Sequence, residues 1–181
     1  MGAFNVIVEN LAIVQEKVQQ ALNNRLNEKF DQTVKLIAVT KNNDIYAMRE
    51  AIDAGIKVVG ENRIQEALDK KKELNRTVEW HLIGHLQTNK VKQAVLNFDL
   101  IHSVDSERLA VEINKVANSL NKVQEILVQV NVVNEISKFG LNIEQVIFFI
   151  KTISHHEDLK VVCLMLIAPY YENPVEPIPI F

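Results

Sequence analysis

The chain has 181 residues, of which 48% are hydrophobic and 24% charged, and this balance is typical of a globular domain with a buried core. The net charge of -3 gives no reason to expect a nucleic-acid partner, and the single cysteine, Cys163, excludes an internal disulfide. Residues 1–11 lack the apolar core of a signal peptide, and the longest apolar run, Val161 to Ala168, is too short to cross a bilayer. We therefore expect a cytoplasmic protein without a membrane partner.

The first predicted element is a long amphipathic helix from Val6 to Phe30. Apolar residues recur in it at spacings of three and four, with Glu, Gln, Lys and Asn between them. After this helix the pattern changes, and short apolar runs alternate with helical stretches up to Leu166.

Six apolar runs predict six strands that are buried on both faces. They cover residues 36–39, 58–60, 80–83, 100–104, 126–132 and 161–166. The helix after the first run should begin near Asp44 and end near Gly55, a natural C-cap. Ser106 is the expected N-cap after the fourth run, and Asn142 with Gln145 resembles a capping box that opens a helix through Ile153.

Strands that alternate with helices predict a parallel sheet, which can be an open doubly wound sheet or a barrel. Thr40-Lys41-Asn42-Asn43 follows the first strand in place of a glycine-rich phosphate turn. On the fifth strand one face carries Leu127, Gln129 and Asn131, and such a face, polar toward the strand end, suits a barrel mouth. We predict an α/β fold over residues 1–181, a single but incomplete (β/α)8 TIM barrel with about six of its eight strands.

Polar residues gather where the predicted strands end, and in parallel barrels the active site lies there. Lys41 directly follows an apolar strand, where low-dielectric surroundings favour a neutral amine able to form a Schiff base. Spacing alone favours the simpler interpretation, an ammonium that reaches water. Asn62 could bind a ligand hydroxyl, although helix capping is favoured. For His85, a ligand contact and a backbone hydrogen bond remain equally open.

Other polar residues receive structural interpretations. His81 and Cys163 are interpreted as packing residues of the core, and Lys70-Lys71-Lys72 as a solvated helix face. No spacing of His, Cys or carboxylate residues indicates a zinc site.

Six blocks of the sequence, in order, carry a resemblance to a known family. They are Ala38-Val39-Thr40-Lys41, Gly60-Glu61-Asn62-Arg63-Ile64-Gln65-Glu66, Trp80 to Lys90, His102-Ser103-Val104-Asp105-Ser106, Ser137-Lys138-Phe139-Gly140-Leu141 and Leu164 to Pro169. The ordered set resembles the signature of the pyridoxal-phosphate homeostasis proteins, the YggS/PROSC-type family.

This resemblance implies a barrel of the alanine-racemase N-terminal type that binds pyridoxal 5'-phosphate. It implies that Lys41 forms an aldimine with the cofactor, that Asn62 sits near its ring, and that His85 and Met165 line the same pocket. Lys138 matches a second lysine that engages the cofactor transiently. The family is believed to buffer or deliver the cofactor, with PLP-dependent apoenzymes as candidate acceptors, and no robust catalytic turnover is attributed to it.

Two further hypotheses remain open. A racemase-like enzyme needs a second acid–base group opposite Lys41, and Tyr46, Tyr170 and Tyr171 match nothing in that role. A non-functional structural fragment would instead associate through exposed strand edges.

The sequence also departs from the family pattern. In the family, further segments follow the part that resembles residues 170–181, and these segments hold the cofactor phosphate. We therefore expect a C-terminally truncated barrel that retains the cofactor weakly, because charge-assisted phosphate contacts are lost, and that oligomerises through its open edges.

Overall fold

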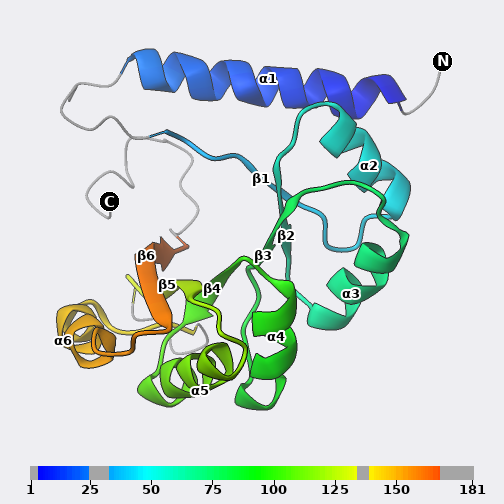
Figure 1. Cartoon of the computed structure of the whole chain (residues 1–181). Helices are drawn as coiled ribbons and strands as arrows, with labels where there is room; N and C mark the ends of the chain where they lie inside the picture. Colours follow the sequence, from blue (N-terminus) through cyan, green and yellow to red (C-terminus); the bar gives the residue numbers. More distant parts are fainter. Residues whose placement is uncertain (1–3, 25–32, 134–138, 168–181) are drawn as a thin grey trace. The chain divides into compact units, whose positions relative to one another are not determined.

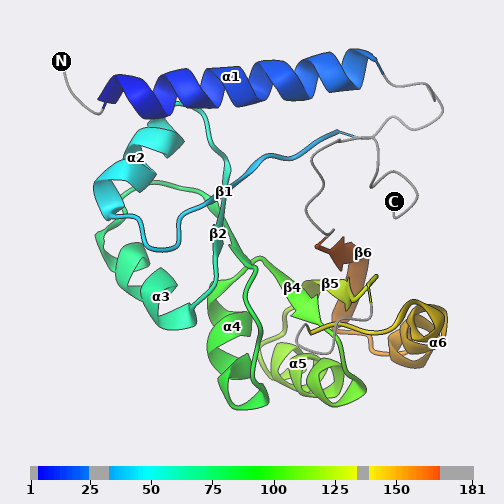
Figure 2. The same ribbon diagram turned by 180° about the vertical axis from the view of Figure 1, so that it is seen from behind.

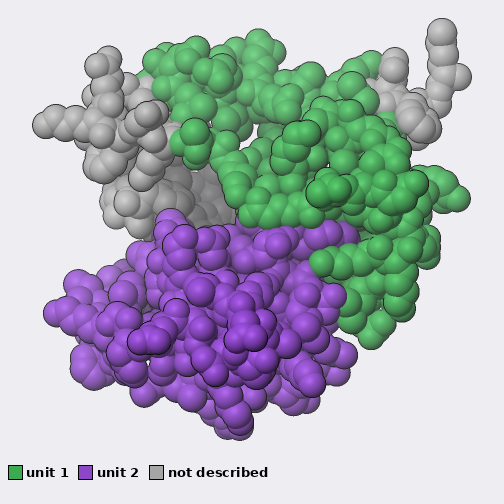
Figure 3. All heavy atoms as spheres, viewed as in Figure 1, with its two compact units in different colours: residues 1–61, 65–79 green, residues 62–64, 80–181 purple. Residues whose placement is uncertain are grey.

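The structure is a computed structural model that describes residues 4–24, 33–133 and 139–167. It divides into two compact units (Figure 3). Unit 1 comprises residues 1–61 and 65–79, and unit 2 comprises residues 62–64 and 80–181. The expectation of a single domain over the whole chain stays a prediction.

Unit 1 begins with the long helix α1, Phe4–Asn23, which packs against α2, Ile45–Asp53 (Figures 1 and 2). The helix predicted over residues 6–30 is confirmed as far as Asn23, and residues 25–32 lie outside the described part. Two strands complete the unit together with a further helix, whose first residue alone belongs to unit 2: β1, Ile37–Val39; β2, Val58–Glu61; and α3, Ile64–Glu73.

Local signals account for the position of α2. The Asp44 side chain accepts the Ala47 N–H at 2.8 Å, which satisfies an amide that the first turn leaves without a partner. Gly55, with φ +112°, follows the helix in the left-handed region, which glycine adopts at low cost. Both predicted ends of this helix are therefore confirmed.

The two strands of unit 1 form a parallel pair in which Ile37 lies opposite Val58 and Val39 opposite Gly60. All four residues of β2 are buried, as expected for a strand covered on both faces. The apolar residues buried in this unit include Ile45, Met48, Ile56, Val58, Val59 and Ala67.

Unit 2 repeats strand and helix in alternation. Its strands are β3, Glu79–Leu82, which begins at the last residue of unit 1; β4, Leu100–Val104; β5, Gln124–Val130; and β6, Leu159–Leu166. Successive strands pair in parallel, β3 with β4, β4 with β5 and β5 with β6. The short 3-10 helix η1, Thr88–Lys90, leads into α4. The helices α4, Val91–Asn97; α5, Glu107–Ser119; and α6, Ile143–Ile153, follow one another along one side of these strands (Figures 1 and 2).

The helix starts in unit 2 follow the predicted signals. Ser106 is the N-cap of α5, with extended backbone. Before α6, the Gln145 side chain accepts the Asn142 N–H at 3.2 Å, which is the capping-box contact expected from these two residues. The faces that these helices turn toward the strands are apolar, and their buried residues include Leu109, Ala110, Ile113, Ala117, Val146, Phe149 and Ile153.

The prediction that Cys163 is a small core residue is wrong. Cys163 is exposed on β6, as are its neighbours Val162 and Leu164. In the described part of the chain β6 pairs with β5 alone. Its other edge has no partner strand there, and side chains along the strand stay exposed. An apolar sequence run reports the tendency to be buried, and the burial itself depends on what packs against the strand.

Candidate functional site

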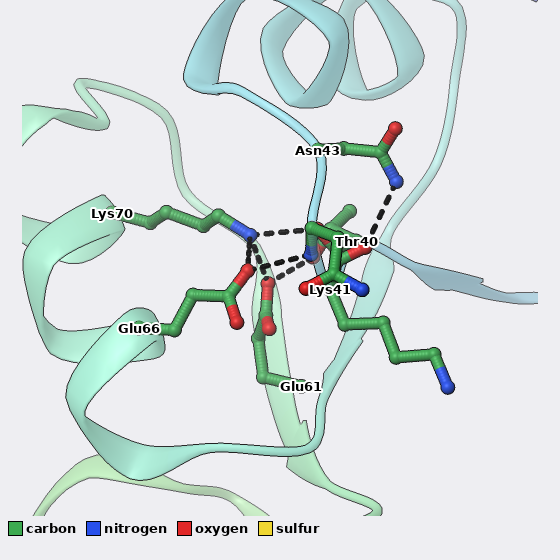
Figure 4. A network of polar contacts seen from close by, with 7 residues as sticks. Thr40, Lys41, Asn43, Glu61, Glu66 and Lys70 are labelled. Carbon is green, nitrogen blue, oxygen red and sulfur yellow. Dashed lines mark hydrogen bonds and ion pairs between the residues drawn. The ribbon is translucent and has the colours of Figure 1, made fainter.

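Lys41 lies in a tight turn that directly follows β1. The carbonyl of Thr40 accepts the Asn43 N–H at 3.1 Å, and Asn42 between them adopts φ 60°, a left-handed conformation that asparagine tolerates. The Asn43 side-chain amide donates to the Lys41 carbonyl at 3.1 Å. The Lys41 side chain is exposed, and Figure 4 shows it extending away from its polar neighbours. No described residue makes a hydrogen bond or ion pair with its amine.

A polar cluster, formed by the buried residues Thr40, Glu61 and Lys70 and the partly buried Glu66, adjoins this turn (Figure 4). The Lys70 ammonium donates to the Thr40 carbonyl at 2.6 Å and to one carboxylate oxygen each of Glu61 and Glu66 at 2.7 Å. The Thr40 hydroxyl donates to the same Glu61 oxygen at 2.6 Å. Burial lowers the pKa of Lys70, but the hydrogen bonds that its ammonium donates to Glu61 and Glu66 outweigh burial and raise the pKa above its ordinary value. Lys70 therefore stays charged.

The interpretation of residues 70–72 as a solvated helix face is wrong for Lys70, which is 9% exposed. The error has a visible source in the sequence. Lys70 follows the buried Ala67 by three residues and precedes Leu74 by four, so it stands on the inward stripe of α3. Glu66, four residues before it, is placed to pair with it on the same face. A lysine on an apolar stripe with such a partner signals a buried ion pair.

In unit 2 the loops after β2 and β3 come into close contact. A Cβ atom at Gly84 would lie 2.2 Å from the carbonyl oxygen of Asn62, so the residue at position 84 must be glycine for the two backbones to approach this closely. Asn62 itself is exposed. The contact holds the predicted site residue Asn62 beside Gly84-His85.

Two residues, Phe139 and Gln129, connect His85 to Met165. The His85 ring stacks on Phe139, with 3.7 Å between ring centroids and 12° between ring planes. The Phe139 carbonyl accepts a hydrogen bond from the Gln129 side chain at 3.2 Å. Met165 on β6 is the register partner of Gln129 on β5. His85 and Met165 are thus linked indirectly, through Phe139 and Gln129. The fifth predicted site residue, Lys138, lies outside the described residues.

A cavity of about 410 Å³ opens beside His85 in unit 2. Polar side chains from the loop after β3 and from the start of α5 contribute to its walls. They include Gln87, Thr88, Asn89, Asp105, Ser106 and Arg108. The cavity therefore lies near the strand ends of unit 2 and is lined by both an acidic and a basic residue, Asp105 and Arg108.

Two histidines are buried in contact on adjacent strands. His102 Nε2 lies 3.0 Å from His81 Nδ1, so one nitrogen donates and the other accepts. The side chains are 7% and 1% exposed, which confirms the packing role predicted for His81. Burial lowers the pKa of His102 to about 4, and the electrostatic interaction with the neighbouring His81 acts in the same direction.

Across the described ranges, no three His, Cys, Asp or Glu side chains come together in a way that could hold a metal ion. In those ranges there is also no helix of sufficient length and apolarity to span a membrane.

Residues 16–178 match the family model described as alanine racemase, N-terminal domain. The pyridoxal phosphate homeostasis protein of Aquifex aeolicus is 40% identical over 174 residues, which cover 96% of this chain and 75% of that protein. The protein of the same name from Escherichia coli K12 is 36% identical over 145 residues, 78% of this chain and 61% of its own length. The chain thus spans between about three fifths and three quarters of these relatives.

Among solved structures, PipY of Synechococcus elongatus PCC7942, determined with PLP bound, is similar with a TM-score of 0.76. It is 35% identical, and the match covers 94% of this chain and 74% of PipY.

Proposed function

Since this chain belongs to the pyridoxal phosphate homeostasis protein family, we propose that it binds pyridoxal 5'-phosphate through Lys41 and serves intracellular homeostasis of that cofactor. Its fold is that of the alanine racemase N-terminal domain, an α/β barrel type, and this agrees with the predicted fold class. The relatives that carry this function in their name are longer than the chain, which covers 75% of one and 61% of another.

The proposal rests on the exposure of the Lys41 side chain and on the absence of a polar partner for its amine among the described residues. A resident cofactor of this kind supplies an aldehyde, which condenses reversibly with a primary amine and releases one water. Lys41 offers such an amine at the carboxyl end of β1, exposed and without a polar partner among the described residues. The backbone of the same residue is held in a hydrogen-bonded turn. An exposed amine is accessible to a ligand, and a fixed backbone sets the direction in which the side chain leaves the turn.

The other site residues have supporting roles in the proposal. Asn62 would offer its exposed amide to polar atoms of the ligand, while the ring of His85, stacked on Phe139, would present a flat surface. Met165 would add an adaptable apolar contact. The assignment of Lys138 as a second, transient lysine rests on the family resemblance. Four further points also stay predictions: delivery to PLP-dependent apoenzymes, a cytoplasmic location, weak cofactor retention, and oligomerisation through strand edges.

The proposed activity is carriage of the cofactor and not catalysis. Racemisation needs a second acid–base group facing the opposite side of the reacting carbon. Tyr46 lies on α2 with 73% of its surface exposed and its ring 5.9 Å from the guanidinium of Arg49, in a surface contact. Tyr170 and Tyr171 lie outside the described residues. A carrier needs only reversible bond formation at Lys41.

The test is the absorption spectrum of the purified chain mixed with pyridoxal phosphate, before and after borohydride reduction, with Lys41→Ala and the matched exposed-lysine control Lys57→Ala. We expect a protein-linked cofactor band in the wild type and the control, its loss in Lys41→Ala, and the reduced cofactor on the peptide containing Lys41. Equal labelling of all three proteins, or labelling spread over surface lysines, would refute the proposal. Lys41-dependent turnover of an amino acid would favour the racemase-like enzyme.

A further inference from the structure

Both peptide groups that flank Lys41 are anchored to the same polar cluster. The carbonyl of Thr40, in the peptide that joins Thr40 to Lys41, accepts from the Lys70 ammonium at 2.6 Å. The N–H of Asn42, in the peptide that follows Lys41, donates to the Glu66 carboxylate at 2.7 Å. Lys70 in turn holds that same Glu66 oxygen at 2.7 Å. A single ammonium thus fixes the backbone on both sides of Lys41 (Figure 4).

We infer that Lys70 is a positioning residue for Lys41, which orients the proposed cofactor-binding amine through the Thr40 carbonyl and through Glu66. This inference rests on the proposed function, because it concerns how the Lys41 amine is presented. Lys70 touches neither Lys41's side chain nor, in the proposal, the ligand. It acts through the two peptide groups that determine where the Lys41 Cα–Cβ bond points.

The donors of Lys70 are fully used in this arrangement. An ammonium has three N–H donors, and here they meet three acceptors, on Thr40, Glu61 and Glu66. Lys70 is therefore a fixed cation and cannot compete with Lys41 for an aldehyde. Lys70 also neutralises the buried Glu61 carboxylate. One oxygen of that carboxylate accepts hydrogen bonds from both the Lys70 ammonium and the Thr40 hydroxyl. The other oxygen is buried without a partner among the described residues.

Rigidity of this kind matters for covalent capture. A nucleophile that is held in one orientation reacts faster than one that must be ordered first, and small displacements of the reacting atom reduce rates by up to about 100-fold. The Lys41 side chain is exposed and flexible along its length, so its backbone is the part that the protein can fix. Release of the Thr40 carbonyl would let the turn move, and capture would slow.

The experiment uses the whole chain and the double variant Glu61→Gln/Lys70→Met. This variant removes the charges of Lys70 and Glu61 together, so that the fully buried Glu61 carboxylate is not left beside an absent cation. The Glu66 carboxylate stays, and its side chain is 23% exposed. Lys72→Met, on the same helix but with its side chain 71% exposed, is the matched control. Three quantities are measured: the exchange rate of the Asn42 and Asn43 amide protons, the rate of borohydride-trapped labelling of Lys41 by pyridoxal phosphate, and the circular dichroism of the linked cofactor per mole bound.

In the double variant we expect faster exchange of both amide protons, labelling of Lys41 slowed by roughly tenfold or more, and a reduced dichroism per bound cofactor. Lys72→Met should match the wild type in all three, and thermal unfolding should show that every protein is folded. A double variant that unfolds is replaced by Lys70→Arg, which keeps the charge but alters the bond geometry and should show the same changes in weaker form. A folded variant with labelling and dichroism equal to wild type overturns the inference while the proposed function stands. Absence of Lys41 labelling in the wild type overturns both.

Discussion

Acidification should destabilise the chain through the buried histidine pair. The pKa of His102 is about 4 in the folded protein, against an ordinary value of 6.5. Between these two values the unfolded chain binds a proton that the folded chain does not, so the free energy of unfolding falls as the pH falls. The stabilisation from neutral His102 is complete above about pH 6.5 and is lost progressively toward pH 4.

The magnitude follows from the difference between the two pKa values. At about 1.4 kcal/mol for each pKa unit, the difference sets a limit of about 3 kcal/mol. Solvent relaxation around a pair that is not wholly enclosed reduces this to about 2 kcal/mol. The structural reason is that protonation of His102 places a charge in a site only 7% exposed, beside a second imidazole at 3.0 Å.

The assay is urea-induced unfolding at a series of pH values from 7 to 4, for the wild type and His102→Gln. The glutamine keeps a polar group near His81 but cannot titrate. Carboxylates that titrate in the same range contribute to both proteins, so the difference between their pH profiles isolates His102. His155→Gln, an exposed histidine, is the control and should behave as wild type. Parallel profiles for the wild type and His102→Gln would show that His102 does not carry this pH dependence.

Two stability predictions concern unit 2. Gly84→Ala places a Cβ 2.2 Å from the Asn62 carbonyl oxygen. Because backbone must move to relieve this contact, the substitution should lower the free energy of unfolding by about 1–3 kcal/mol. An unchanged urea midpoint would contradict the close approach of the two backbones. Phe98→Ala removes a ring that is 1% exposed and should lower the free energy of unfolding by about 3–5 kcal/mol. Its control Leu96→Ala, at a residue 55% exposed, should change it by about 0.5 kcal/mol or less; equal effects at the two positions would show that Phe98 is not a core residue.

Much of the secondary structure is predictable because its signals are local. The fourth predicted strand, Leu100–Val104, agrees with β4 residue for residue, and the other strands differ by one or two residues at their ends. Asp44, Gly55 and Gln145 mark helix ends by hydrogen bonds or backbone angles within a few residues of themselves. Such signals act before any tertiary contact forms and can be found by inspection of a single chain.

Two interpretations failed where a side chain's environment is made by distant parts of the chain. Lys70 seemed one of three solvated lysines, but the Thr40 carbonyl and Glu61, 30 and nine residues away, enclose it. The apolar neighbours of Cys163 predict a core residue, but β6 in the described structure has one partner strand and Cys163 is exposed. Residue type alone predicts a preference for burial, and the packing decides the outcome.

The alternation of strands and helices, the position of Lys41 directly after the first strand, and the ordered blocks by which the family is recognised can all be read from the sequence. These properties depend on hydrophobic periodicity and on residue order, which are local. Three contacts become visible only in the folded chain: Lys70 binds the turn around Lys41, His85 stacks on Phe139, and His81 contacts His102. Each of these contacts joins residues at least 21 positions apart, where geometry depends on how strands and helices pack and not on the preferences of neighbouring residues.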